Sequence, residues 1–136
     1  VAITRELTSA TIAVWAKVQN TLLPTPARFH YVFNMRELSR VFQGIMETPL
    51  ESVPSDKRMV SLWRHECARV FGDKLARDED KAFVEKAVAD VAAQIFGEAV
   101  VGKGKSEQWW CDFQREVVVT EDEEDARAPK VYEPVQ

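Results

Sequence analysis

The stretch HYVFNMRELSRVF, residues 30–42, contains the start signal of a helix. Asn34 is among the preferred N-cap residues, and Glu37 follows it at the spacing of a capping box. The aromatic residues before Asn34 alternate with other residues, which predicts a short extended lead-in over residues 29–33. We therefore expect a helix over residues 34–47. The glycine at position 44 costs this helix about 1 kcal/mol relative to Ala, unless something packs closely against it.

Arg36 falls in the first turn of this predicted helix, which is an unusual place for a cation. The helix macrodipole favours anions at the N-terminus. The free backbone N–H groups there also suit a bound phosphate or carboxylate. One interpretation is that Arg36 shares an anionic ligand with the helix end. The other, which the spacing alone favours, is that its side chain pairs with a nearby acid or extends into water.

Apolar residues recur at steps of three and four in three further segments, which predicts three further helices. Pro24 and Pro26 end the first, Ser55 caps the next, Asp78 caps the last, and Gly97 ends it. The positions expected to face a shared core are Ile3, Leu7, Thr11, Val14, Val18 and Leu22 in the first helix, Leu38, Val41, Phe42 and Ile45 in the second, Met59, Trp63, Cys67, Val70 and Phe71 in the third, and Phe83, Val84, Ala87, Val88, Val91 and Ile95 in the fourth. The fold class predicted is mainly α, a four- to five-helix bundle over residues 1–97.

After the predicted bundle the pattern changes, and we treat residues 98–136 as a C-terminal extension that is irregular or strand-like. The segment WWCDFQREVVV, residues 109–119, predicts a short helix or a docked segment. The segment REVVVTE, residues 115–121, is consistent with a strand, but one strand cannot make a sheet inside a helical domain. The segment KVYEPV, residues 130–135, is also strand-like, and we expect its partner outside this chain. Trp109 and Trp110 indicate either an interface, since Trp is enriched at binding hot spots, or burial against the bundle.

The composition is that of an ordinary globular chain of one domain, with 136 residues of which 46% are hydrophobic and 29% charged. The formal net charge of -4 argues against a nucleic-acid surface, because duplex binding depends on cationic contacts to phosphate. No apolar run approaches the length of a membrane span. The sequence does not begin with Met, so we expect a piece of a longer polypeptide.

No residue pattern in the sequence is able to carry out a reaction unaided. The phosphate-binding GxxxxGK[ST] and the dinucleotide-binding GxGxxG motifs are absent. His65 and Glu66 resemble the start of a zinc-binding HExxH motif, but Arg69 stands where the second His should be. Cys67 has apolar helical neighbours, which predicts a core thiol. The acids at residues 121–125 lack the spacing of a calcium loop. We expect no catalytic residue and no metal site.

Two longer motifs resemble a known family. LLPTPARFHYVFNMRELSRVFQGI, residues 22–45, resembles the lid segment of a dynein heavy chain AAA+ module. MVSLWRHECARVFGDKLARDED, residues 59–80, resembles a later helix of the same lid. The first motif is most similar to the third AAA+ module of axonemal dyneins, and the tail with VYEPV is similar to the strand that leads into the fourth module. The segment GKGKSEQWWCDF, residues 102–113, follows no fixed family pattern.

The resemblance implies that the chain is a small helical AAA+ lid. In AAA+ proteins ATP lies between a large α/β subdomain and the lid, so ATP or ADP is implied only for the intact module and not for this fragment. Arg36 matches the sensor 2 arginine, which reaches toward the phosphates, and Asn34 and Glu37 would cap the helix that positions it. An arginine suits this task because its planar fork holds phosphate oxygens bidentately.

The implied function is a non-catalytic lid of a dynein heavy chain, a minus-end-directed microtubule motor ATPase. The lid would close over the nucleotide and relay its state to the next module. The implied partners are the large subdomain of the same module, the following AAA+ module and, through the parent motor, microtubules, with no nucleic acid and no membrane. The implied location is the cytoskeleton, in the axoneme of a cilium or flagellum. The alternative is a stand-alone helical protein–protein interaction module that uses Trp109, Trp110 and the acidic segment.

Overall fold

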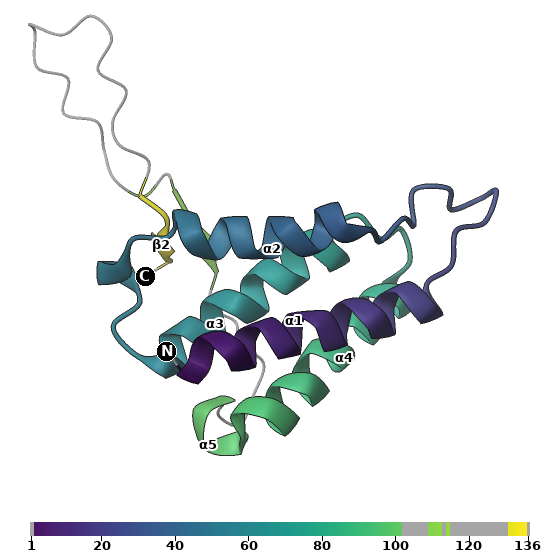
Figure 1. Cartoon of the computed structure of the whole chain (residues 1–136). Helices are drawn as coiled ribbons and strands as arrows, with labels where there is room; N and C mark the ends of the chain where they lie inside the picture. Colours follow the sequence, from purple (N-terminus) through teal and green to yellow (C-terminus); the bar gives the residue numbers. More distant parts are fainter. Residues whose placement is uncertain (1, 102–108, 113, 115–130, 136) are drawn as a thin grey trace, which may run out of the picture.

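The chain folds as an antiparallel helical bundle (Figure 1), seen in a computed structural model that describes residues 2–101, 109–112, 114 and 131–135. The long helices are α1 (Ala2–Thr21), α2 (Met35–Glu47), α3 (Asp56–Cys67) and α4 (Asp78–Phe96). The shorter elements are the 3-10 helix η1 (Leu50–Ser52), the π-helical turn η2 (Ala68–Gly72), α5 (Glu98–Val101), and the strands β1 (Trp110–Cys111) and β2 (Glu133–Pro134). The predicted fold class, a mainly helical bundle with a strand-like tail, is confirmed.

Local signals in the sequence fix most helix ends. α1 ends at Thr21, ahead of the two prolines, and Ser55 caps α3 by accepting a hydrogen bond from the backbone N–H of Arg58 at 3.3 Å. Gly97 follows α4 with φ of 77°, a conformation that only glycine adopts readily. α3 continues without a break into the π-helical turn that ends at Gly72.

The cap of α4 differs from the prediction by one residue. Arg77 is the N-cap, with extended backbone angles and no side-chain capping bond, and its carbonyl accepts a hydrogen bond from the backbone N–H of Lys81 at 3.1 Å. The chain therefore enters the helix one residue earlier than expected, and Asp78 is the first helical residue. Its charge and those of Glu79 and Asp80 still lie in the first turn, where the macrodipole stabilises anions.

The lead-in to α2 is shorter than predicted. Phe29 and His30 form a turn, which is stabilised by a hydrogen bond from the Tyr31 N–H to the Arg28 carbonyl at 3.1 Å. The alternation expected of an extended segment is limited to residues 31–33, of which the first and last are buried and the middle one is exposed.

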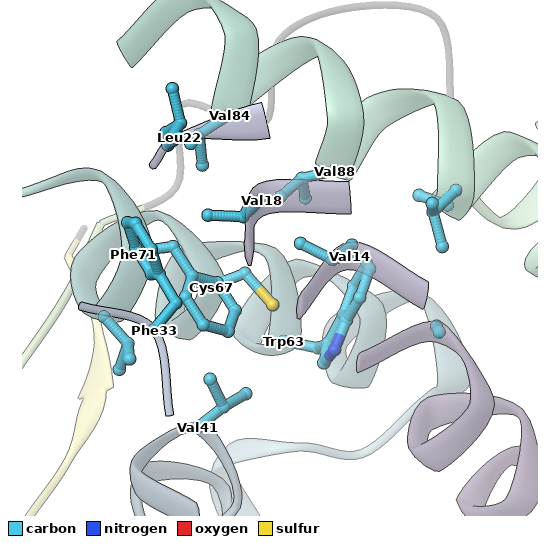
Figure 2. Packing of buried hydrophobic residues seen from close by; sticks show 14 of the residues in the cluster. Val14, Val18, Leu22, Phe33, Val41, Trp63, Cys67, Phe71, Val84 and Val88 are labelled. Atoms are coloured by element: carbon cyan, nitrogen blue, oxygen red, sulfur yellow. The ribbon is translucent and has the colours of Figure 1, made fainter. Parts of the chain in front are cut away.

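The main core lies between the four long helices (Figure 2). Its polar members are satisfied: the buried Thr11 hydroxyl donates to the Leu7 carbonyl at 2.6 Å and accepts from Trp63 Nε1 at 2.9 Å. The buried apolar residues of this cluster are Leu7, Ala10, Val14, Val18, Leu22, Tyr31, Phe33, Val41, Trp63, Cys67, Val70, Phe71, Leu75, Val84, Val88, Val91 and Ala92. They include most of the positions predicted to face inward, and Cys67 is a core thiol as expected.

The tail forms a small sheet on the bundle. β1 and β2 pair antiparallel, with Trp110 opposite Pro134 and Cys111 opposite Glu133. The expectation that the strand in KVYEPV has its partner outside the chain was wrong, because Trp110 packs in a second apolar cluster with Val53 and Leu62 and so brings β1 within reach. The predicted strand in REVVVTE and the acidic loop lie outside the described residues. The division of the chain after residue 97 stays a prediction.

Candidate functional site

The start of α2 is held by reciprocal capping. Asn34 Oδ1 accepts a hydrogen bond from the Arg36 N–H at 2.9 Å, and the Glu37 carboxylate accepts one from the Asn34 N–H at 3.0 Å. The capping box predicted from the sequence is therefore present. It fixes the backbone from which the Arg36 side chain projects, because two of the donors left unpaired at a helix N-terminus now have partners.

The side chain of Arg36 is exposed at this end of the bundle. Within the part of the chain that the structure describes, its guanidinium makes no ion pair or hydrogen bond. The adjacent acid, Glu37, is occupied by the Asn34 N–H and lies 3.6 Å from Lys74 Nζ. The pairing with a nearby acid that sequence reasoning left open is therefore not made by described residues, and the guanidinium is accessible to a ligand.

Hydrogen bonds from two parts of the bundle hold the segment before α2 in place. From α1, Trp15 Nε1 and Gln19 Nε2 both donate to the Phe33 carbonyl, at 3.2 and 3.0 Å. From the connection before α4, Lys74 Nζ donates to the Val32 carbonyl at 2.7 Å and lies 4.1 Å from the centre of the Phe33 ring. Burial lowers the pKa of Lys74. These contacts hold the first turn of α2 against the bundle.

Four large apolar side chains are exposed on the connection between α1 and α2 and at the first residue of α2. We call the four of them the lead-in surface. Its members, with exposed fractions, are Leu23 (60%), Phe29 (77%), Val32 (47%) and Met35 (63%). A group of large exposed apolar residues along one connection is typical of a surface that meets another protein part.

A second constellation surrounds a buried carboxylate on α3. Glu66 is fully buried, and its Oε2 accepts hydrogen bonds from Arg69 Nη2 at 2.6 Å and Nε at 3.1 Å. Its Oε1 accepts a hydrogen bond from the Tyr132 hydroxyl at 2.7 Å. The bond to Glu66 is the main cause that raises the pKa of Arg69, whereas burial, followed by the same carboxylate, raises that of Tyr132.

Gly44 of α2 makes room for this carboxylate. A Cβ atom at Gly44 would lie 2.0 Å from Glu66 Oε2 and 2.4 Å from Glu66 Cδ, far inside van der Waals contact. From the sequence, Gly44 was expected to destabilise α2 unless another group packs closely against it. Glu66 is that group. Glu66 itself was considered only as part of a failed zinc motif. The signals that could have identified it are its place beside the apolar stripe of α3 and an arginine three residues later.

The remaining sequence candidates divide between the surface and the interior. Trp109 is 68% exposed, whereas Trp110 is 4% exposed and buried against the bundle. The ring of His65 lies 6.1 Å from that of Trp109 and 6.2 Å from that of Tyr132, and burial lowers the pKa of His65. Burial raises the pKa of the Cys67 thiol, which keeps it protonated. An interface role for the two tryptophans stays a prediction.

The two constellations lie at opposite ends of α2, with Arg36 at its start and Gly44 near its end beside the small sheet (Figure 1). Among the described residues, no group of three or more His, Cys, Asp or Glu side chains could hold a metal ion. No described helix has the length and apolar character needed to cross a membrane. The bundle has the exposed Arg36 at one end of α2 and the contact between Glu66 and the tail near the other end.

Comparison with known families identifies a lid domain. Residues 7–101 match the family described as AAA+ lid domain. The matched stretch begins inside α1 and extends to the last residue of α5, so it contains most of α1 and the whole of α2, α3, α4 and α5. It also contains both Arg36 and Glu66.

Comparison with curated proteins finds dynein heavy chains. The chain is 37% identical over 136 residues to "Dynein axonemal heavy chain 5" of Mus musculus, in an alignment that covers 96% of this chain and 3% of that protein. It is 40% identical over 129 residues to "Dynein gamma chain, flagellar outer arm" of Chlamydomonas reinhardtii, covering 84% and 3%. It is 36% identical over 136 residues to "Dynein axonemal heavy chain 10" of Homo sapiens, covering 100% and 3%. The chain spans about 3% of the length of these relatives.

Proposed function

The chain belongs to the AAA+ lid domain family, and from this premise we propose that it is the non-catalytic lid of an AAA+ module in an axonemal-type dynein heavy chain. The sequence motifs that resemble the third module make that module our assignment. In this role the lid closes over the nucleotide of its own module and relays the state of the nucleotide to the next one. The parent motor would act on microtubules, as the resemblance to dynein heavy chains implies. Its place would be the axoneme of a cilium or flagellum, in line with the words axonemal, flagellar and ciliary in the names of the relatives.

The observation that carries this proposal is the exposed guanidinium of Arg36, which projects from a capped helix start. Its backbone is held by the Asn34–Glu37 capping box, and its side chain is exposed without an acidic partner among the described residues. A phosphate group suits the exposed guanidinium of an arginine, whose planar fork can hold two phosphate oxygens. Arg36 would distinguish ATP from ADP because the γ-phosphate supplies contacts that exist only in one state.

The lead-in surface gives the lid a second point of contact. Three of its exposed apolar side chains lie on the connection between α1 and α2, and the fourth, Met35, directly precedes the proposed sensing arginine in the sequence. In the proposed role this surface packs against the large subdomain of the same module, which removes it from water when the lid closes. Nucleotide contact and subdomain contact would then occur at the same end of the bundle.

The test is the Arg36→Ala substitution in the parent motor, with nucleotide binding at the other modules blocked by substitution. We expect weaker ATP binding or slower turnover at this module, with the helical content of the lid unchanged. Arg40→Ala is the matched control, because Arg40 is an exposed arginine one turn further along the same helix. Unchanged affinity and turnover for Arg36→Ala would remove the sensor role. The isolated chain is expected to bind ATP weakly, since the rest of the pocket is absent from it.

The alternative, a stand-alone interaction module, is distinguished by the size of the native polypeptide. An immunoblot of cell extract with an antibody to this segment should show a band far above the 15.5 kDa of the chain itself. A band near 15.5 kDa would favour the interaction module and would leave Arg36 without a nucleotide pocket to serve.

A further inference from the structure

Three segments that are far apart in the sequence meet at the carboxylate of Glu66. α2 contributes Gly44, the turn after α3 contributes Arg69, and the tail contributes Tyr132. We define the C-terminal strap as residues 109–111 and 132–135, which contain β1, β2 and a hydrogen bond from the Val135 N–H to the Trp109 carbonyl at 2.8 Å. A single side chain therefore contacts two helical parts of the bundle and the strap.

We propose that Glu66 is the anchor of the C-terminal strap and that it couples the strap to α2, so that a displacement of α2 against α3 releases the strap. This goes beyond the proposed function, because it needs neither a nucleotide nor a second module. It concerns only contacts within this chain, and it can be tested whether or not Arg36 senses phosphate.

The burial of Glu66 makes its hydrogen-bond partners necessary. Its side chain is 1% exposed, and a charge removed from water needs close partners to be stable. Arg69 satisfies one oxygen and Tyr132 the other. A strap that leaves the bundle takes away the partner of Oε1, so the docked strap and the buried carboxylate stabilise one another.

The helix α2 contacts the same carboxylate. A methyl group at Gly44 would overlap the carboxylate, so the backbone of α2 lies directly against Glu66. Any movement of α2 toward α3 must displace the carboxylate, and the carboxylate holds the Tyr132 hydroxyl at 2.7 Å. A change in the position of α2 would therefore move the carboxylate and disturb its hydrogen bond to the strap. The coupling passes through one chain of contacts.

The strap itself is small. Each strand contains two residues, and Trp110 packs in a cluster separate from the main core. Its other described contacts include those of the Trp109 and Tyr132 rings with His65, at 6.1 and 6.2 Å. On the side of η1 a groove of about 610 Å³ lies between the strap and the loop before α3. A two-stranded ribbon of this size is not stable by itself, so release of the anchor is expected to free the strap while the core stays folded.

The chain carries its own probe for this release. It contains two cysteines, Cys111 in the strap and Cys67 in the main core, and both are buried. Opening of the strap alone exposes Cys111, whereas unfolding of the bundle exposes both. We would measure the rate at which a thiol reagent labels each cysteine of the 136-residue chain, resolved by peptide mass spectrometry, and take the ratio of the Cys111 rate to the Cys67 rate.

The variant that removes the anchor bond is Tyr132→Phe. We expect it to raise the ratio at least about tenfold, because a hydrogen bond to a charged group changes an equilibrium by a factor of roughly 10 to 150. The matched control is Tyr31→Phe, at the other tyrosine of the chain, whose hydroxyl donates to Asp80 at 2.8 Å inside the bundle. The control should leave the ratio unchanged. A strap that stays protected in Tyr132→Phe overturns the anchor.

The variant that displaces the carboxylate from the α2 side is Gly44→Ala. Its matched control is Gly72→Ala, where an added Cβ meets no atom within 4 Å. We expect the Cys111 to Cys67 ratio to rise in Gly44→Ala and not in the control. In the double variant with Tyr132→Phe, Gly44→Ala should add little, since the bond it disturbs is already gone. Equal acceleration of both cysteines, or fully multiplicative effects in the double variant, would overturn the coupling.

Discussion

At the scale of the residue, Glu66 and Arg69 form an ion pair whose two members lie in unequal surroundings. The side chain of Glu66 is 1% exposed, whereas that of Arg69 is 47% exposed. Water can therefore solvate the guanidinium when its partner is removed, but it reaches the carboxylate poorly. The effect of breaking the pair should depend on which member is lost.

We predict that Arg69→Met destabilises the chain more than Glu66→Gln does. The first substitution leaves a buried carboxylate with Tyr132 as its remaining partner and should lower the free energy of unfolding by about 3 kcal/mol. The second leaves a half-exposed cation and an amide, and should cost about 1–2 kcal/mol. Urea unfolding followed by circular dichroism measures both. Equal losses would mean that Glu66 is solvated and is not a desolvated anchor.

Residues with local signals were predictable, and residues whose role depends on tertiary contacts were not. The bonds between Asn34 and Glu37 join neighbours in sequence, so their spacing was enough to predict them. Gly44 could be flagged as costly, but the atom that fills the space beside it comes from α3. Glu66 carried no signal for its bond to Tyr132, because that partner lies 66 positions further along the chain.

At the scale of the element, the two ends of α4 differ in how closely local sequence determines them. Its first turn is acidic, and its cap is Arg77, without a side-chain capping bond, rather than the predicted Asp78. Its C-terminal end is controlled by Gly97, at φ 77° and ψ 156°. Few residues other than glycine populate that region.

We therefore predict that Gly97→Ala lowers the free energy of unfolding by about 1–3 kcal/mol, the typical cost of a non-glycine residue in that backbone region. Gly72→Ala is the comparison, because Gly72 has negative φ and open space around a new Cβ. It should be neutral or stabilise by up to about 1 kcal/mol, since alanine reduces the freedom of the unfolded chain. Thermal and urea unfolding of both variants would check this. A loss at Gly72 equal to that at Gly97 would contradict the conformational explanation.

The strands β1 and β2 are the elements that sequence reasoning could describe only in part. Each is two residues long, and the two strands are separated by more than 20 positions. The period-2 pattern that predicts a strand needs a longer run, and nothing in the run VYEP identifies Trp110 as part of its partner. The pairing follows from the burial of Trp110 beside Val53 and Leu62, which is a property of the folded bundle.

At the scale of the whole molecule, the chain consists of a self-contained core and an appended strap. The members of the main core come from the four long helices and their connections, and none comes from the strap. Residues that recur with helical spacing were sufficient to predict this core, because each helix buries one stripe. The described contacts that attach the strap include the second apolar cluster, the ring contacts of His65 and the hydrogen bond to Glu66.

The last prediction concerns a chain that ends at Val101 and so lacks the strap. It should keep its helical signal and unfold cooperatively, with a free energy of unfolding lower by about 2–4 kcal/mol, because it loses the buried Trp110 side chain and the Tyr132 bond. Water then reaches Glu66, so Arg69→Met should cost clearly less in the shortened chain than in the full one. Urea unfolding of the four proteins gives this comparison directly. If Arg69→Met costs the same in both, the strap does not bury the carboxylate, and the mutual stabilisation of strap and anchor would be refuted.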